Sequence, residues 1–419
     1  MARPGSRRGP FEPTPGSGRD PAGSKHRLDA RLAPTVLPAR RRGRPSGRYR
    51  ALTASLLLAG GVLIVAQTGP DQVGLPAEAA AGDLADAPPP SVPETPTTTP
   101  ARPSPRAAPP APADVEPVTL AFGGDVHAEG GSGAALRAGL PTVRDVLGRA
   151  DVAVLNLETA VTDGGTRADK QFAYRAPVSV LSSLKSAGVD VVTLANNHGV
   201  DYGRDGLLDT LAASAATGLP VVGIGRDEDA AYAPHVIEVR GQRIAVLGAT
   251  QVLDSNLQAA WTAGPWTPGL ASAKRETRLL EEVARAREVS DTVVVYVHWG
   301  RELDSCPLPQ QQDLARQLVA AGADVVVGSH AHVLLGGGWL DGAYVDYGLG
   351  NFVFGARSQE TTRTGVLTLD VSGRTVTAAT WTPGRVRSGA PVLLAGERAR
   401  AAVADKERRR GCTGLSATP

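Results

Sequence analysis

The sequence predicts an α/β fold for the part of the chain that begins near Val118, and two observations carry this prediction. First, short apolar runs typical of buried strands alternate with segments that show the apolar spacing of helices. Second, several of these runs end in histidine, asparagine or acidic residues. Such residues gather where the carboxyl ends of strands form a site in an α/β sheet.

Each expected element follows from its local pattern. Strand-like runs are predicted at residues 118–122, 152–155, 189–194, 221–224, 236–239, 244–248, 292–298, 324–327, 343–347, 365–371 and 375–380. Helices are predicted at residues 142–150, 178–187, 202–216, 271–287, 310–321 and 397–410. Turn residues at 240–242 and 372–373 indicate hairpins. The last part is therefore β-rich, and no internal repeat is apparent.

The first 50 residues are a basic segment that we interpret as a disordered cytoplasmic tail. They hold 13 Lys and Arg against 3 Asp and Glu, whereas the rest of the chain holds 31 against 39. Their Arg, Pro, Gly and Ser content offers too little apolar surface for a core. Because the basic excess lies in this tail, it gives no reason to expect nucleic acid as the partner of the folded part.

Residues 51–69 contain an apolar run with the composition of a membrane span. The chain carries no charge from Ala51 until Asp71, which is just long enough to cross a bilayer. Basic residues precede the run, so we expect a single-pass anchor in the cell membrane with the globular domain extracytoplasmic. The alternatives are a buried core helix and a signal sequence cleaved near Ala79, which would release a secreted protein.

The remaining segments differ sharply in composition. Residues 70–117 hold 14 of the 33 prolines and are predicted to be an extended Pro/Ala/Thr-rich linker. Residues 118–386 form the predicted globular domain, and residues 387–419 form a C-terminal extension. The only cysteines are Cys306 and Cys412. Export would favour a disulfide between them, and a cytosolic location would leave two free thiols.

Five of the seven histidines follow the end of an apolar strand-like run. They are His127, His198, His298, His330 and His332. Asp125, Glu158 and Asn197 occupy similar positions. A single histidine of this kind is usually structural, but such a set at equivalent positions predicts a shared site. In an extended segment residues i and i+2 point the same way, so we expect the pairs Asp125/His127 and His330/His332 each to face one site.

The donor types restrict the chemistry of that site. Oxygen and imidazole donors without thiolates suit Mn, Fe, Zn or Mg rather than a structural zinc knuckle. The number of donors is sufficient for two divalent ions. A pair of ions about 3.5–4 Å apart can clamp a phosphoryl group and activate water at neutral pH. His198, adjacent to Asn197, would point elsewhere and could act as a general acid.

The polar segments at the strand ends resemble the motifs of a known family. The segments at 124–127, 196–198 and 328–332, with His298, look like the motif series of the calcineurin-like metallophosphoesterases. More specifically, the segments at 156–158, 196–203, 298–302, 328–333 and 347–352 resemble the CapA family, which is associated with poly-γ-glutamate capsule biosynthesis. The resemblance extends from about residue 118 to about residue 383.

The resemblance implies a four-layer α/β/β/α sandwich and a role for each matching residue. One metal ion would be held by Asp125, His127 and His332, and the other by Asn197, His298 and His330. His198 would be the catalytic histidine. The phosphoesterase pattern has a bridging aspartate after the second strand, and here Glu158 stands in its place. Whether Glu158 can replace the bridging aspartate decides whether the site hydrolyses a substrate or only binds metal.

Five further residues are weaker candidates. Lys170, Tyr174 and Arg175 lie in a loop after the second strand and could bind an anionic substrate; the alternative is a solvated loop. Glu302 follows His298-Trp-Gly and could be an acid/base group, or a surface carboxylate. Asn351 follows a glycine-rich segment and could line the site, or could belong to a simple turn.

Two classes of function follow from these patterns. The first is a CapA-type accessory protein that binds an anionic polymer, poly-γ-glutamate by resemblance, within a polyglutamate synthase complex. The second is a metal-dependent hydrolase, phosphoesterase-like, that acts on a cell-envelope substrate. Retention of polymer production without the catalytic histidine would favour the first class.

Overall fold

The computed structural model describes residues 116–419. The predicted basic tail, membrane anchor or signal sequence, and proline-rich linker lie outside the described residues. Among the residues that are described, no helix combines the length and the apolar character that a bilayer crossing requires. The chain-wide division into segments therefore stays a prediction.

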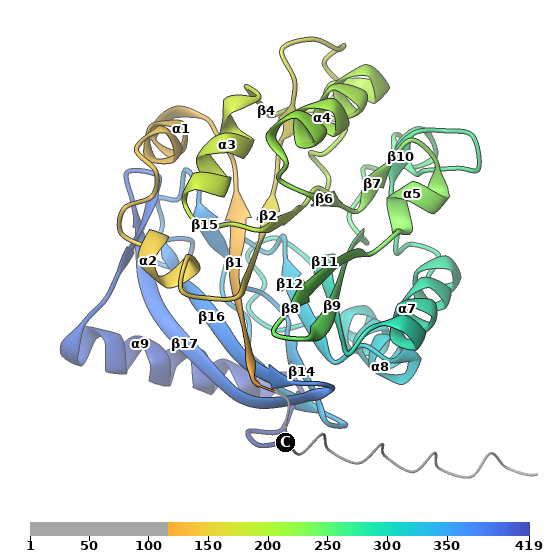
Figure 1. Cartoon of the computed structure of the whole chain (residues 1–419). Coiled ribbons are helices and arrows are strands. Elements are labelled where there is room, and N and C mark those ends of the chain that lie inside the picture. The colour runs from red at the N-terminus through yellow and green to blue at the C-terminus, as the bar shows by residue number, and fades with distance from the viewer. Residues whose placement is uncertain (1–115) are drawn as a thin grey trace, which may run out of the picture. The chain divides into compact units, whose positions relative to one another are not determined.

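Two main sheets form the centre of the described part of the chain (Figure 1). The first has the order β18-β17-β16-β1-β2-β5-β6, with β15 paired to β1. Its strands are β1 (Val118–Val126), β2 (Val152–Leu157), β5 (Val191–Thr193), β6 (Val221–Val222), β15 (Asn351–Val353), β16 (Arg363–Ser372), β17 (Thr375–Arg387) and β18 (Ala390–Leu393). The strands β1, β2, β5 and β6 run parallel, whereas β16, β17 and β18 are antiparallel hairpin strands.

The second main sheet has the order β13-β14-β12-β11-β9-β8. Its strands are β8 (His235–Val239), β9 (Gln242–Thr250), β11 (Thr292–His298), β12 (Val325–Ser329), β13 (Gly337–Leu340) and β14 (Ala343–Asp346). Two small pairs join β3 (Ala160–Val161) to β4 (Arg175–Ala176), and β7 (Ile224–Gly225) to β10 (Gly269–Leu270). The second sheet combines parallel β9, β11, β12 and β14 with antiparallel partners at both edges.

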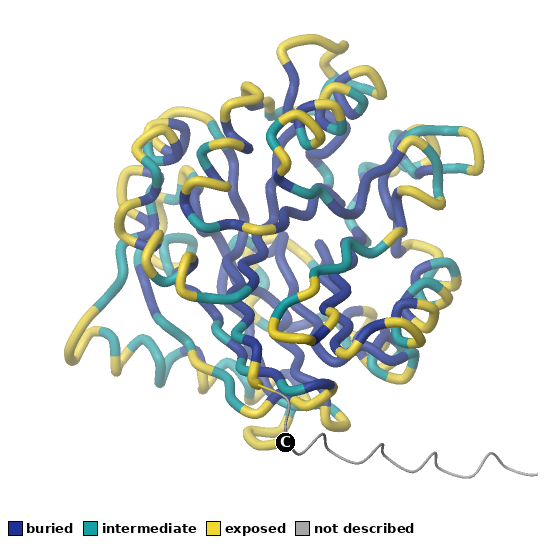
Figure 2. Tube along the Cα trace, in the orientation of Figure 1, coloured by how far each residue is buried: buried dark blue, intermediate teal, exposed yellow. Residues whose placement is uncertain are grey.

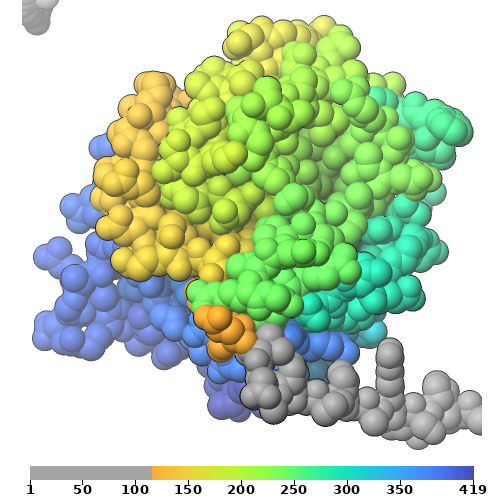
Figure 3. Space-filling model, in the orientation of Figure 1, coloured from red at the N-terminus to blue at the C-terminus, as the bar shows by residue number. Residues whose placement is uncertain are grey.

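The helices pack on the outer faces of the two sheets. They are α1 (Gly130–Arg137), α2 (Arg144–Leu147), α3 (Ser179–Ser186), α4 (Gly203–Thr217), α5 (Glu228–Tyr232), α6 (Gln258–Trp261), α7 (Thr277–Val289), α8 (Pro309–Ala321) and α9 (Gly396–Arg408), followed by the short 3-10 turn η1 (Arg409–Cys412). In Figure 3 the residues of α1, α3 and α4 cover the near face of the first sheet. In Figure 2 the strands are buried, and exposed residues gather on the outer sides of the helices.

Three apolar clusters show how the layers are held together. One lies between the first sheet and its helices, and includes Leu155 and Leu184. A second lies between the second sheet and α7 and α8, and includes Val295 and Leu314. The third joins residues of both sheets, such as Phe122 and Tyr296. The strands that are covered on both faces read as continuous apolar runs for this reason. The predicted α/β fold is confirmed, and the layers run helices, sheet, sheet, helices.

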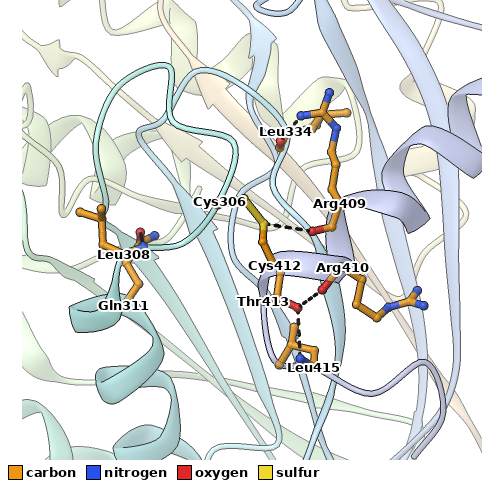
Figure 4. The surroundings of a disulfide bond; sticks show 9 residues. All are labelled: Cys306, Leu308, Gln311, Leu334, Arg409, Arg410, Cys412, Thr413 and Leu415. Carbon is orange, nitrogen blue, oxygen red and sulfur yellow. Dashed lines mark hydrogen bonds between the residues drawn. A yellow bond between two sulfur atoms is a disulfide. The ribbon is translucent and has the colours of Figure 1, made fainter.

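The C-terminal segment is part of the folded domain. Strand β18 pairs with β17, and α9 packs beside the same strand (Figure 1). A disulfide links Cys306, in the loop before α8, to Cys412 in η1 (Figure 4). In the same region Arg409 donates a hydrogen bond of 2.7 Å to the carbonyl of Leu334. The C-terminal segment is thereby attached to the loops that follow β11 and β12.

Gly124 is required by a close approach of two backbone segments. A Cβ atom at this position would lie 1.8 Å from the carbonyl oxygen of Gly350. We expect Gly124→Ala to lower the free energy of unfolding by about 2 to 3 kcal/mol, because neither backbone segment can move away without losing its ladder. Chemical denaturation measures this difference. Gly411→Ala, where a Cβ meets nothing within 4 Å, is the control. Equal effects at both positions would contradict the explanation.

Candidate metal centre

The candidate site lies where parallel strands of both sheets end. In the first sheet Asp125 of β1 is in register with Asn156 of β2, and Glu158 is the first residue after β2. In the second sheet His298 ends β11 and is in register with Ser329 of β12. Because the two sheets pack face to face, these carboxyl ends meet at one place.

Glu158 is at the centre of the site. Its side chain is fully buried, and neither carboxylate oxygen has a hydrogen-bond partner. One of these oxygens, Oε1, lies 3.6 Å from Nε2 of His298, 3.9 Å from Nε2 of His332 and 4.0 Å from Nε2 of His198. A buried carboxylate without a donor is costly, so the site is built for a group that supplies positive charge.

Two sets of side chains offer ligand atoms close enough together for one ion each. The first set is Glu158, His298 and His330, and the second is Asp125, Glu158 and His332. Within each set the ligand atoms lie within 4.8 Å of one another. Nδ1 of His330 is buried and has no hydrogen-bond partner either. Glu158 belongs to both sets, which is the position of a bridging ligand.

The electrostatics of the site favour a cation. Burial, followed by repulsion from Asp125, raises the pKa of Glu158 well above its usual value. Burial by itself lowers the pKa of His332, but attraction from Glu158 and Asp125 outweighs it and raises the pKa to about 9. The two carboxylates thus favour a positive charge at this place, which a bound cation would supply. The oxygen and imidazole donors present here fit a divalent metal ion.

His298 is held in a fixed orientation by neutral groups. Its Nδ1 lies 3.0 Å from Oγ of Ser329 and 3.2 Å from Nδ2 of Asn156. Its Nε2 lies 2.9 Å from Oδ1 of Asn197. Burial and the nearby His330 lower the pKa of His298 well below its usual value. The imidazole is therefore neutral, which is the form that binds metals.

The pair His330 and His332 reaches the site by a different geometry from the one expected. Both residues have positive φ angles, 92° and 56°, so the segment is a tight loop and not an extended strand. The rule that residues i and i+2 point the same way does not apply there. The loop is fixed in part by the amide of His330, which donates a 3.3 Å hydrogen bond to Asp125. This strained backbone brings each imidazole into a different set.

His127 lies beside the site but outside both sets. Its Nδ1 lies 3.1 Å from the amide of Glu129, and its Nε2 lies 3.0 Å from the amide of Gly355. The ring packs edge-on against Phe354 at 4.1 Å between centroids. Burial lowers its pKa to about 4. In this arrangement His127 offers no atom to either ligand set, so the ligand role that the resemblance implies for it stays a prediction.

His198 forms a closely coupled pair with Asp201. Its Nδ1 donates to Oδ2 of Asp201 over 2.6 Å, and both side chains are buried. Nε2 is therefore left facing Glu158 and the ligand sets. Burial lowers the pKa of His198, and the bond to Asp201 opposes that effect. A histidine oriented by a carboxylate is a recurring arrangement for moving a proton.

Lys170 lies beside this pair, with its charge engaged by acidic side chains of the domain. Its ammonium lies 3.1 Å from Asp201 and 3.1 Å from Asp254. It also donates a 2.5 Å hydrogen bond to the carbonyl of Asn197. The side chain is only 9% exposed, with Trp261 5.1 Å away. The charge of Lys170 is thus paired within the domain, which fits a role in positioning Asp201 and the loop of Asn197, while its predicted substrate-binding role stays a prediction.

The other candidates take distinct places around the site. The ring of Tyr174 lies tilted against that of His198, with 4.3 Å between centroids, and burial raises the pKa of Tyr174 to about 12. Arg175 is exposed and lies over the ring of Tyr202 at 4.9 Å. Asn351 contacts Nδ1 of His332 at 2.9 Å and orients that ligand. Glu302 is exposed, and its charge raises the pKa of His332 from outside the sets.

The structure adds residues that the sequence reasoning did not assign to the site. Asn156 donates a 2.8 Å hydrogen bond to Asp125, and its own oxygen accepts one of 2.9 Å from Asn196. Phe354 packs against His332 at 4.7 Å. Asp201 could have been found from its position three residues after His198, whereas the sequence carries no local signal for Phe354.

Comparison with known proteins supports the family resemblance. Residues 119–356 match a family model described as bacterial capsule synthesis protein PGA_cap. The chain is 36% identical over 215 residues to the PGA biosynthesis protein CapA of Bacillus subtilis (strain 168), covering 51% of this chain and 55% of that protein. It is 37% identical over 192 residues to the capsule biosynthesis protein CapA of Bacillus anthracis, covering 45% and 46%. The chain thus spans about half the length of these curated relatives.

Among solved structures, a novel phosphatase from Mycoplasma pneumoniae aligns with a TM-score of 0.43 and 15% identity, over 69% of this chain and 98% of that one. The matched family segment contains every member of both ligand sets. It also covers more than half of the chain, which confirms the CapA resemblance seen in the sequence motifs. The chain belongs to the family of bacterial capsule synthesis proteins described by the PGA_cap model.

Proposed function

We propose that this protein takes part in making, exporting or retaining poly-γ-glutamate or a similar anionic polymer of the cell surface, and that it does so through a divalent-metal centre built around Glu158. The relatives named for PGA biosynthesis and capsule biosynthesis support the polymer assignment. The observation that carries the metal assignment is the buried Glu158 carboxylate, whose oxygens have no partner and belong to two ligand sets.

The location of this activity is also part of the proposal. The apolar run at residues 51–69, preceded by basic residues, supports an anchor in the cell membrane with the domain on the extracytoplasmic side. The disulfide between Cys306 and Cys412 agrees with an oxidising compartment. A synthase complex at the membrane is the partner that this location favours.

The residues of the centre have separable tasks. Glu158, His298 and His330 would hold one ion, and Asp125, Glu158 and His332 the other. Bound Mn, Zn, Fe or Mg would supply Lewis-acid chemistry to an anionic group in the site. His198 would hold or release a proton at Nε2, because Nδ1 is engaged by Asp201. The ring of Tyr174 contacts that of His198, which is buried.

A second function, metal-dependent hydrolysis of a cell-envelope substrate, is favoured by one specific observation. The buried His198–Asp201 pair places Nε2 4.0 Å from Glu158, where a leaving group would need a proton. A purely binding role has no evident need for this pair. The two functions differ in whether proton transfer at His198 is required.

Deletion and complementation in the native host test the proposal. Loss of the gene is expected to lower the amount of cell-surface polymer, and the wild-type gene should restore it. Glu158→Gln should fail to restore it, whereas His235→Gln, a change in β8 away from the site, should succeed. Unchanged polymer after deletion would rule out the polymer assignment.

We expect His198→Ala to keep its bound metal, because His198 belongs to neither ligand set. If hydrolysis is the function, this variant should lose about 100-fold or more of the rate on a phosphodiester or γ-glutamyl substrate. Metal analysis and rate measurements on the same preparation check both statements. Full polymer production by this variant would assign the protein to the non-catalytic class.

A further inference from the structure

A groove along α9 is lined largely by residues that follow the segment matching the capsule-protein family. Its centre is a cavity of about 410 Å³ between α9 and the strands β16 and β17. A neighbouring cavity of about 500 Å³ shares Arg387, Leu394 and Arg398 with it. Another of about 560 Å³, beside the disulfide, shares Asp405 and Arg408. The three cavities therefore follow one another along the helix.

Arginines dominate the lining of the central cavity. They are Arg363, Arg385, Arg387, Arg398 and Arg408, and Asp405 is the one acidic residue among the lining residues. Asp405 is already paired with Arg363, Arg408 and Arg409. Arg387 and Arg398 are exposed, and their guanidinium groups have no ion pair or hydrogen bond within residues 116–419. Glu360 and Glu397 line the two neighbouring cavities, so six arginines face three carboxylates over the whole groove and its lining keeps a net positive charge.

The neighbourhood of Arg385 shows the same excess of positive charge. Its guanidinium donates to the carbonyl of Gln359 at 2.6 Å and to Oγ1 of Thr362 at 3.2 Å, and to no carboxylate. Burial and repulsion from Arg363 lower its pKa. An anion in the groove would relieve this repulsion, because both guanidinium groups would then face a negative charge.

Three further donors lie in the lining without a partner. They are Nε of Arg363, Oγ1 of Thr364 and Nε1 of Trp381. The side chain of Thr364 is buried, and the residue is only 1% exposed. Each of these groups can donate a hydrogen bond to an oxygen, and buried donors are normally paired. They point to an oxyanion as the missing partner.

The spacing along α9 indicates an extended ligand. Arg398, Ala401, Ala402, Asp405 and Arg408 line the cavity, and their spacing places them on one face of the helix. Arg398 and Arg408 lie ten residues apart, which corresponds to about 15 Å along the helix. Apolar residues, including Leu334, Pro383 and Leu394, line the same cavity. A lining that combines guanidinium groups with apolar side chains suits a chain whose carboxylates are separated by methylene groups better than a polyphosphate, which has no apolar part.

We propose that this groove binds a linear polycarboxylate chain. The identification of that chain with poly-γ-glutamate rests on the proposed function, but the groove itself does not depend on the metal centre. It would hold the polymer by the arginines of β17 and α9 at a place separate from the ligand sets. The domain would then have one site for a bound metal and another for retaining the polymer.

Fluorescence anisotropy with a labelled γ-linked glutamate decamer and the full-length chain tests this proposal. The double variant Arg387→Ala/Arg398→Ala is expected to bind at least about tenfold more weakly, because two exposed charge contacts are lost. Arg398→Ala alone should also weaken binding, and Arg400→Ala is its matched control: it removes one charge from the same helix, but Arg400 lines none of the three cavities. All three variants alter exposed side chains, and their thermal unfolding should match the wild type.

Glu158→Gln separates this inference from the metal proposal. It should leave decamer binding unchanged, so failure of the metal centre would not affect this result. Equal affinity of the double variant and the wild type would overturn the groove assignment. Tighter binding of a polyphosphate of equal charge would overturn the polycarboxylate assignment, as would displacement of the decamer by inorganic phosphate at equal charge concentration.

Discussion

Glu158→Gln is expected to abolish stoichiometric binding of divalent metal, with a loss of affinity of about 100-fold or more. The glutamine has the same shape, but it removes the negative charge that both ligand sets share. It also replaces one acceptor oxygen with an amide that donates toward the nearby imidazoles. Elemental analysis after reconstitution, together with titration calorimetry, measures the loss.

Glu302→Gln is the matched control for this experiment. It removes a carboxylate whose charge also acts on Glu158 and His332, but Glu302 is exposed and belongs to neither set. We expect it to keep full metal content with a small change in affinity. Equal metal content in wild-type protein and Glu158→Gln would contradict the assignment of Glu158 as the shared ligand. Equal losses in both variants would mean that general negative charge, and not ligation, binds the ion.

Lys406→Met is expected to lower the free energy of unfolding by about 3 to 5 kcal/mol. Lys406 lies in α9, is buried, and has its ammonium 2.8 Å from Oδ2 of Asp346. It also donates a 2.6 Å hydrogen bond to the carbonyl of Leu335. Methionine fills the space but leaves the buried Asp346 carboxylate without its counter-ion, and this uncompensated charge is the main cost. Chemical denaturation gives the difference.

Two further variants make this result specific. Adding Asp346→Asn to Lys406→Met should recover part of the lost stability, because the unpaired charge is then absent. Lys274→Met, at an exposed lysine without an ion pair in the described part of the chain, should change stability by less than about 0.5 kcal/mol. A loss as large in Lys274→Met would indicate that the effect is not the buried pair. Lys406 also holds the carbonyl of Leu335, which lies three residues after the ligand His332. Lys406→Met should therefore weaken metal binding as well.

Sequence patterns locate most of the candidate ligand residues along the chain, but only the fold shows which of them share a metal ion. Asp125, His298 and His330 were expected at strand ends because apolar runs stop at polar residues there. The pattern does not say which neighbours share an ion. In the structure His127 turns toward the amides of Glu129 and Gly355, and the second set uses Glu158 in its place.

Lys170 illustrates the same limit for charged residues. A basic residue in a polar loop is a candidate for binding an anion. Its ammonium is instead held by Asp201 and Asp254, residues that lie 31 and 84 positions further along the chain. Local sequence does not reveal such partners, because folding brings them together through the packing of separate loops.

The sequence by itself determined the α/β class, the family and the strand-end origin of the site, because these depend on residue periodicity and on short motifs. Only the tertiary structure decided that Glu158 is shared by two ligand sets, that His330 and His332 lie in a loop with positive φ angles, and that arginines of β17 and α9 line one groove. These features depend on the face-to-face packing of two sheets and on the docking of α9. Both are set by contacts between residues far apart in the chain, which no local pattern encodes.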